Sequence, residues 1–166
     1  MTPSEANAIT PDSVGHRLCA ACQSAGACKL GLKCLGLDDQ GAVDFDIVCG
    51  PQFEGGRGVA HGGWTAATLD EMLGTVAMLH KSLTVTKSLA VEFLKPVPIG
   101  QALKGRAWND HKQGHRWHNV GEISLAATGV VLGRATGVFS QRNPDHFDRH
   151  EAWLKAELAG AAPQPS

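Results

Sequence analysis

Residues 61–70 combine a glycine pair and a carboxylate in a pattern that could perform acyl-transfer chemistry. His61-Gly62-Gly63 leads into a run of good helix formers, and the first N–H groups of a helix have no partner inside it. The macrodipole makes that end electropositive, and glycine lacks the Cβ that would keep a substrate oxygen at a distance. These amides could therefore form an oxyanion hole, although a glycine turn that only leads into a helix would have the same local pattern.

Asp70 is the second candidate for chemistry. It lies inside an otherwise apolar helical segment, where a carboxylate is costly to bury unless it has partners or a task. Its neighbour Glu71 fits a solvated stripe of that helix, and the same assignment is the alternative for Asp70. A buried carboxylate could serve as a nucleophile or as a base toward a carbonyl group.

The spacing of the two features predicts a site shared between subunits. Gly63 and Asp70 are seven residues apart, so they lie on nearly the same helix face but roughly 10 Å apart along the axis. One carbonyl carbon must lie within about 3 Å of both the nucleophile and the oxyanion donors. Two antiparallel copies related by a two-fold axis would satisfy this requirement, so we expect a homodimer with two shared sites.

Periodicity predicts the elements that must position these residues. Residues 42–48 alternate apolar and polar side chains as a half-buried strand does, and residues 64–79 are apolar nearly all around, as in a buried helix. Strand patterns follow at 84–94, 101–110, 115–127 and 129–140, with turns at 112–114 and 127–129, and a short helix at 145–159. Small residues on one face of the last strand would let the helix approach closely. We therefore predict an α+β fold in which one curved antiparallel sheet wraps around one long central helix.

The first 40 residues are predicted to form an N-terminal extension with a Cys-rich segment, in which 13–24 form a weak helix and 25–40 an irregular connection. Residues 41–142 form the main domain, and residues 143–166 a C-terminal helix and tail. The Cys-rich segment is a candidate zinc site, but it lacks a second Cys-x-x-Cys pair. Packed free thiols are the preferred interpretation, and no metal is expected. The four cysteines concerned are Cys19, Cys22, Cys28 and Cys34.

Composition excludes several classes of protein. The chain has 166 residues with 43% hydrophobic and 19% charged residues and a formal net charge of −1. Nothing in these totals indicates nucleic-acid binding, and no apolar run is long enough to span a bilayer. The first residues lack the basic-then-apolar pattern of a secretory signal. We therefore expect a cytoplasmic protein that binds neither nucleic acid nor a membrane.

Several motifs together resemble the hotdog-fold thioesterases of the phenylacetate-pathway (PaaI-like) group in the 4-hydroxybenzoyl-CoA thioesterase superfamily. The resemblance covers residues 41 to about 140. It implies a hotdog fold, an acyl-CoA substrate and no cofactor. The motifs are Phe53-Glu-Gly-Gly-Arg-Gly-Val-Ala-His-Gly-Gly63, Leu69-Asp70-Glu71, Val85-Thr86 and Phe93-Leu-Lys-Pro-Val-Pro-Ile-Gly100.

The resemblance also implies roles for individual residues. A backbone N–H of Gly62 or Gly63 would polarise the thioester carbonyl, and Asp70 would act as nucleophile or as general base for water. Thr86 matches a Ser or Thr that helps to place the water or the carboxylate, and His61 belongs to the loop architecture. Many relatives carry Asn or Gln six residues before this histidine, where the present chain has Gly55; the loop instead resembles an aromatic-x-Gly-x-x-Gly variant that also contains thioesterases.

The leading hypothesis is a thioesterase that hydrolyses a small or medium, including aromatic, acyl-CoA as a homodimer or a dimer of dimers. Phe53 and Trp64 are the candidates for substrate binding, although Trp64 could equally pack the start of the helix. The alternatives are an acyl-CoA-binding hotdog protein without turnover, a hotdog dehydratase and a Cys-rich metal-binding module. Six cations are candidates to contact the CoA phosphates, namely Lys95, Lys104, Arg106, Lys112, Arg116 and Arg134.

Overall fold

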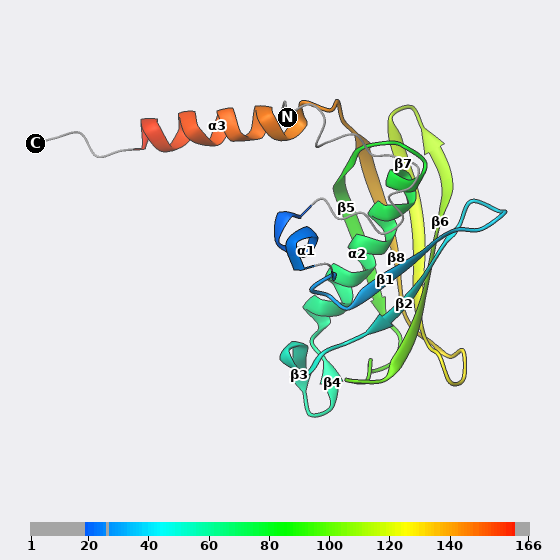
Figure 1. The fold of residues 1–166 in the computed structure, drawn as a ribbon. Helices are drawn as coiled ribbons and strands as arrows, with labels where there is room; N and C mark the ends of the chain where they lie inside the picture. The colour runs from blue at the N-terminus through cyan, green and yellow to red at the C-terminus, as the bar shows by residue number, and fades with distance from the viewer. Residues whose placement is uncertain (1–18, 26, 162–166) are drawn as a thin grey trace, which may run out of the picture.

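The computed structural model describes residues 19–25 and 27–161. One long helix, α2, packs against a six-stranded antiparallel sheet that curves around it (Figure 1). The elements in chain order are α1 (Ala20–Ala25), β1 (Leu32–Leu37), β2 (Val43–Val48), η1 (Pro51–Phe53), β3 (Glu54–Gly56), β4 (Val59–Ala60), α2 (Gly62–Leu79), β5 (Thr84–Phe93), β6 (Ala102–Gln113), β7 (Arg116–Leu125), β8 (Val131–Gln141) and α3 (His146–Gly160). The predicted α+β architecture is confirmed.

The strands lie in the order β1-β2-β6-β7-β8-β5, and β3 and β4 form a separate two-stranded ribbon. β5 is therefore an edge strand whose outer side has no neighbour within the described part of the chain. It pairs antiparallel with β8, with Thr84 opposite Gln141 and Thr86 opposite Phe139, and the register slips between Thr86 and Ser88. An exposed edge of this kind is a ready template for pairing with another strand.

Glycines in the sheet let α2 lie close to it. A Cβ added at Gly121 would lie 2.5 Å from Cδ1 of Leu73, and one added at Gly137 would lie 3.2 Å from Cδ2 of the same leucine. Leu73 is fully buried, so larger side chains in these strands would push the helix outward. The predicted role of small residues in the last strand is confirmed. Asn119 of β7 also connects the sheet to α2 by a hydrogen bond, because its Nδ2 donates to the carbonyl oxygen of Leu73 at 2.9 Å.

The prediction of an irregular connection over residues 25–40 is wrong, because it contains strand β1 paired with β2. The strand escaped detection because its apolar residues do not alternate cleanly: Leu32 is buried, whereas Leu35 and Leu37 are exposed. Burial in β1 alternates regularly from residue to residue, so the sequence pattern failed because apolar residues lie on both faces of the strand; the register also shifts between Cys34 and Gly36. The weak helix expected at 13–24 occurs at Ala20–Ala25, and residues 13–18 lie outside the described residues.

Two further boundaries differ in detail. β6 continues through Gln113, so the turn expected at 112–114 is confined to Gly114 and His115, and Gly114 has a φ of 58°. The C-terminal helix α3 forms as predicted and projects away from the body of the molecule (Figure 1). None of its residues is buried. No helix in the described residues is long and apolar enough to cross a membrane.

Candidate active site

Asp70 and Thr86 meet at a pocket between α2 and β5. The Oγ1 of Thr86 donates a hydrogen bond to Oδ1 of Asp70 at 2.8 Å, which orients the carboxylate. The pocket has a volume of about 340 Å³. Its wall also contains Cys19, Glu71 and Val85. The other lining residues belong to no motif, and sequence reasoning did not select them; they are Gly74, Thr75, Met78, Ser82, Leu83, Thr84 and Phe139. Glu71 is exposed, as predicted.

His61 caps the N-terminus of α2. Its Nδ1 accepts a hydrogen bond from the N–H of Gly63 at 2.9 Å, and its carbonyl oxygen accepts from the N–H groups of Trp64 and Thr65 at 2.9 and 3.2 Å. The amide of Gly63 is therefore engaged by the cap. The N–H of Gly62 makes no hydrogen bond to any described residue, and Gly62 is exposed. Gly62 is thus the amide available to an incoming oxygen atom.

The loop before α2 is held by the segment that follows β5. The N–H of Ala60 donates to the carbonyl of Val97 at 2.8 Å, and the N–H of Ile99 donates to the carbonyl of Gly58 at 3.1 Å. Val59 also forms a bridge with Pro98. The two sequence motifs, one at the glycine loop and one at Lys95-Pro-Val-Pro, are therefore parts of one structure that fixes where the helix begins.

Gly55 occupies a position where a side chain does not fit. A Cβ added there would lie 2.6 Å from Cα of His61, a backbone atom that cannot rotate away. The N–H of His61 also donates to the carbonyl of Phe53 at 2.7 Å, so the loop is closed tightly at this point. The loop in this conformation therefore has no room for an Asn or Gln side chain at position 55.

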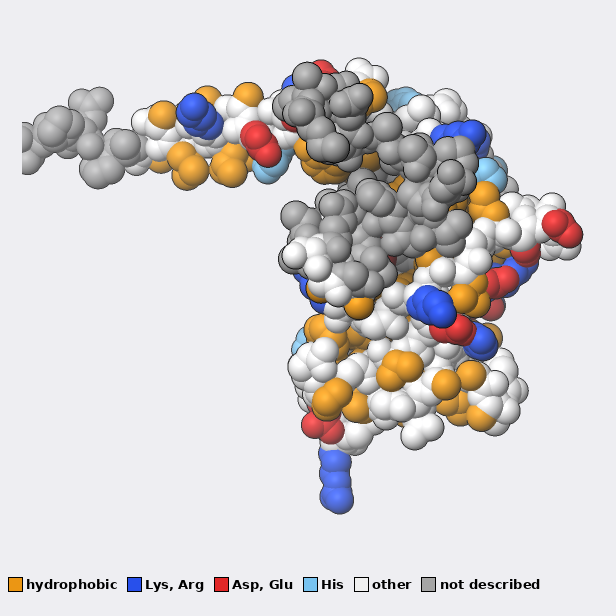
Figure 2. Space-filling view, viewed as in Figure 1, with side chains coloured by type: hydrophobic (Ala, Val, Ile, Leu, Met, Phe, Trp, Pro, Cys, Tyr) orange, Lys and Arg blue, Asp and Glu red, His pale blue; other side chains and the backbone are white. Residues whose placement is uncertain are grey.

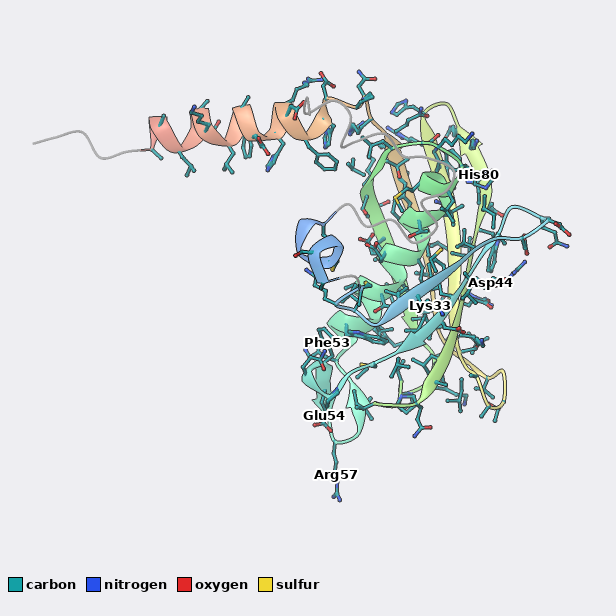
Figure 3. The ribbon with its side chains drawn as sticks, in the orientation of Figure 1. Lys33, Asp44, Phe53, Glu54, Arg57 and His80 are labelled. Atoms are coloured by element: carbon teal, nitrogen blue, oxygen red, sulfur yellow. The ribbon has the colours of Figure 1, made fainter. Side chains whose placement is uncertain are left out.

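The two candidates for substrate binding lie at this loop. Trp64 is buried, and its Nε1 donates to the carbonyl of Leu30 at 3.0 Å. Its ring centroid lies 6.4 Å from that of Phe53, which is half-buried at the end of η1 (Figure 3). Trp64 therefore packs the start of α2 against the segment before β1. A contact of either residue with substrate stays a prediction.

The glycines and the carboxylate do not meet within one chain. Gly62 is the first residue of α2 and Asp70 lies in its middle, so about 12 Å of helix axis separates them. The structure thus brings Asp70 to Thr86 and His61 to Gly63, and it leaves these two pairs apart. A single chain cannot present both groups to one carbonyl carbon.

Most of the cations considered for the CoA phosphates have other partners. Lys104 pairs with Asp46, Arg106 with both Asp38 and Asp44, and Arg134 with Glu122. The guanidinium of Arg106 holds the pKa of Asp38 below its usual value. Lys112 lies 3.7 Å above the ring centroid of Trp117. Lys95 and Arg116 make no ion pair with a described residue.

No two cysteines in the described part of the chain form a disulfide bond. A hydrogen bond with Cys22 is the main cause that raises the pKa of Cys19 above its ordinary value. Among the described residues, no group of three His, Cys, Asp or Glu side chains could hold a metal ion.

Comparison with known proteins relates this chain to the thioesterases. Residues 57–124 match the family model described as the thioesterase superfamily. The PaaI protein of the Escherichia coli phenylacetic acid degradation operon has a similar structure, with a TM-score of 0.67 at 16% identity over 83% of this chain and 95% of that chain. A hypothetical thioesterase from Streptococcus pneumoniae, crystallised with coenzyme A, gives a TM-score of 0.63 at 18% identity over 68% and 90%.

A thioesterase superfamily protein of known structure is 24% identical with a TM-score of 0.62, and the match covers 67% of this chain but only 54% of that chain. All three structures share the curved sheet around a central helix with the present chain. The resemblance predicted from the glycine loop and the Lys95-Pro-Val-Pro segment is therefore confirmed: residues 57–124 match the model of the thioesterase superfamily, and the chain has the hotdog fold of these structures.

Proposed function

We propose that the protein hydrolyses the thioester of a small or medium acyl-CoA, aromatic acyl groups included, to the free acid and CoA. The observation that carries this proposal is the hydrogen bond from Thr86 to Asp70 at the edge of a pocket. Asp70 belongs to α2, and the first N–H group of that helix, at Gly62, has no hydrogen-bond partner among the described residues. A carboxylate and an oxyanion donor are the two groups that thioester hydrolysis requires. The superfamily match and the coenzyme A in a structural neighbour support the thioester class.

In this mechanism, the carbonyl oxygen of the thioester accepts a hydrogen bond from the N–H of Gly62. Asp70 either takes a proton from a water molecule that attacks the carbonyl carbon or attacks that carbon itself. In the first route the C–S bond breaks, the acid forms directly, and the proton held by Asp70 passes to the leaving thiolate to give CoA-SH. In the second route the C–S bond breaks to give a mixed anhydride on Asp70 and a thiolate; water then hydrolyses the anhydride, which releases the acid, restores the carboxylate and supplies the proton that the thiolate takes up. The hydroxyl of Thr86 holds one carboxylate oxygen, so the other remains available for the reaction.

The separation of Gly62 and Asp70 along α2 supports a site shared between two subunits. A two-fold axis that sets two copies of α2 antiparallel would bring Gly62 of one protomer toward Asp70 of the other. The free edge of β5 offers a strand through which two sheets could join. We therefore infer a homodimer with two sites, of which two could further associate as a dimer of dimers.

The same pair of residue types was varied in a structural neighbour. The Streptococcus pneumoniae thioesterase was also crystallised with one aspartate or one threonine replaced by alanine. Those two residues are sixteen positions apart, the same separation as Asp70 and Thr86. This coincidence supports a joint role for the two residues in the present chain.

A second candidate function is acyl-CoA binding without turnover. The absence of an amide side chain at Gly55 favours it, because many relatives use Asn or Gln there to orient the attack. The two functions differ in whether thiol is released.

A thiol-release assay over a panel of acyl-CoAs tests the proposed function. We expect multiple turnovers for at least one short, medium or aromatic acyl group and saturation at micromolar to millimolar substrate, the range usual for enzymes. Binding of the same acyl-CoAs without release of thiol would instead establish the binding protein.

Replacing Thr86 by valine should lower kcat by roughly tenfold, because the carboxylate of Asp70 then loses the hydrogen bond that orients it. The matched control is Thr86→Ser, which keeps the hydroxyl and should retain most of the activity. Equal kcat values for the valine and serine variants would show that the hydroxyl of Thr86 has no positioning role.

A further inference from the structure

A second pocket lies where β8 ends and α3 begins. Its volume is about 600 Å³, and it lies outside the segment that matches the thioesterase superfamily. Basic and aromatic side chains predominate in its wall, with one carboxylate among them. The lining residues are Gln141, Arg142, Asn143, Asp145, His146, Arg149, His150 and Trp153.

The two arginines of this pocket differ from those on the sheet. Arg106 and Arg134 are each bonded to a carboxylate. Arg142 and Arg149 make no ion pair with any described residue, and Nη1 of Arg142 contacts only the carbonyl of Gln141 at 3.3 Å. Asp145 is the one carboxylate in the wall, so the pocket has a net positive charge that an anionic ligand would balance.

The helix arranges the remaining groups on one face. His146, Arg149, His150 and Trp153 follow the i, i+3, i+4, i+7 spacing, which places them along one side of α3. Trp153 is 56% exposed, and the ring of His150 lies 5.6 Å from it. Figure 2 shows α3 standing clear of the body with charged and hydrophobic side chains along its length. An exposed indole beside unpaired guanidinium groups suits a planar base that carries phosphates.

This pocket adjoins the one that contains Asp70. Gln141 pairs with Thr84 across the two strands, and the N–H of Arg142 donates to the carbonyl of Leu83 at 2.9 Å. Leu83 and Thr84 line the Asp70 pocket, so the ends of β5 and β8 form the wall between the two. Thr84 and Thr86 are two residues apart, which is about 7 Å along a strand. A flexible arm between a thioester and a nucleotide could cross such a wall.

We propose that the pocket at the base of α3 binds the nucleotide phosphates of the CoA thioester, with Arg142 and Arg149 on the phosphates and Trp153 against the adenine ring. This inference rests on the proposed function and narrows it. A carrier-protein thioester has a phosphopantetheine arm but no adenine and no 3′-phosphate. The pocket therefore makes the enzyme selective for CoA thioesters over carrier-protein thioesters.

The kinetic test compares an acyl-CoA with the acyl-pantetheine that carries the same acyl group. The variants are Arg142→Gln, Arg149→Gln and Trp153→Ala, and the control is Lys155→Gln, which changes a cation on the same helix outside the pocket. Each pocket variant should raise KM for acyl-CoA roughly tenfold and leave kcat unchanged. The kinetic constants for acyl-pantetheine should not change. Equal KM values for acyl-CoA in the wild type and the pocket variants would overturn the proposal.

A binding measurement separates this proposal from the proposed function, because it needs no turnover. Calorimetry with adenosine 3′,5′-bisphosphate should show binding to the wild type and to the Lys155 variant, and binding roughly tenfold weaker to each pocket variant. If the protein hydrolyses no thioester and this pattern still appears, the pocket assignment stands and the enzyme assignment fails. If inorganic phosphate binds as tightly as the bisphosphate, or if all variants bind alike, the nucleotide assignment is overturned.

Discussion

Asp70→Asn is expected to lower kcat for thioester hydrolysis by about 10³-fold, within the range for removal of a general base. The amide has the shape of the carboxylate, but it neither attacks a thioester nor accepts a proton from water at neutral pH. Its oxygen can still accept the hydrogen bond from Thr86 that the structure shows for Asp70. The variant should therefore fold normally and keep its oligomeric state while it loses turnover.

The measurement is a thiol-release assay in parallel with thermal unfolding. Glu92→Gln is the matched control, since it removes an exposed carboxylate on β5 that does not line the Asp70 pocket. The control should keep kcat within about twofold of the wild type, as expected for a surface substitution. Full turnover in the Asp70 variant would exclude this residue as the base or nucleophile and would leave the chemistry without a carboxylate.

The periodicity of the sequence was sufficient to predict the fold, because the long buried helix and the strands after it have regular patterns of apolar residues. β2 keeps its alternation with Val43, Phe45 and Ile47 buried, and these positions were predictable. β1 was not, because its leucines lie on both faces of the strand, Leu32 buried and Leu35 and Leu37 exposed. A strand at the edge of a sheet needs fewer apolar residues than a central one, so its pattern is weaker.

The site was predictable to the level of residue type and helix spacing. From the sequence alone, the N–H groups of Gly62 and Gly63 are equally good candidates for the oxyanion donor. The structure distinguishes them, because the N–H of Gly63 donates to the ring of His61 and that of Gly62 does not. The close approach of Gly55 to His61 depends on the fold of the whole loop. The same is true of the hydrogen bond from the N–H of Ala60 to the carbonyl of Val97. Contacts between segments distant in sequence have no local signature. The contact that leaves Gly62 free is local, but residue type alone does not say that the ring of His61 turns back to Gly63.

Gly62→Pro is expected to lower kcat by about 10²- to 10³-fold, because it removes the one amide hydrogen that the site leaves free for the oxyanion. Proline is well tolerated as the first residue of a helix, and Gly62 has that position in α2. His61 has φ −59° and ψ 138°, which is the extended conformation that a residue before proline adopts. The helix should therefore begin where it does now.

Gly62→Ala is the control for bulk. Its Cβ would lie 3.4 Å from Cε1 of Phe93, an ordinary contact, and it keeps the N–H group. The alanine variant should retain turnover within about threefold of the wild type, so that the difference between the two variants measures the amide hydrogen. Similar losses in both would mean that space beside Phe93, and not the N–H, limits the reaction.

Mixing the two inactive variants tests whether the site is shared. In a heterodimer of Asp70→Asn and Gly62→Pro chains, one site combines the intact Asp70 of one protomer with the intact Gly62 of the other, and the second site has neither. Random exchange makes half of all dimers mixed, so about a quarter of wild-type activity should return. A site within one chain would give no recovery, because each chain lacks one of the two groups. Recovery after unfolding and refolding the variants together, and none when they are refolded apart, would therefore assign the oxyanion amide and the carboxylate to different subunits.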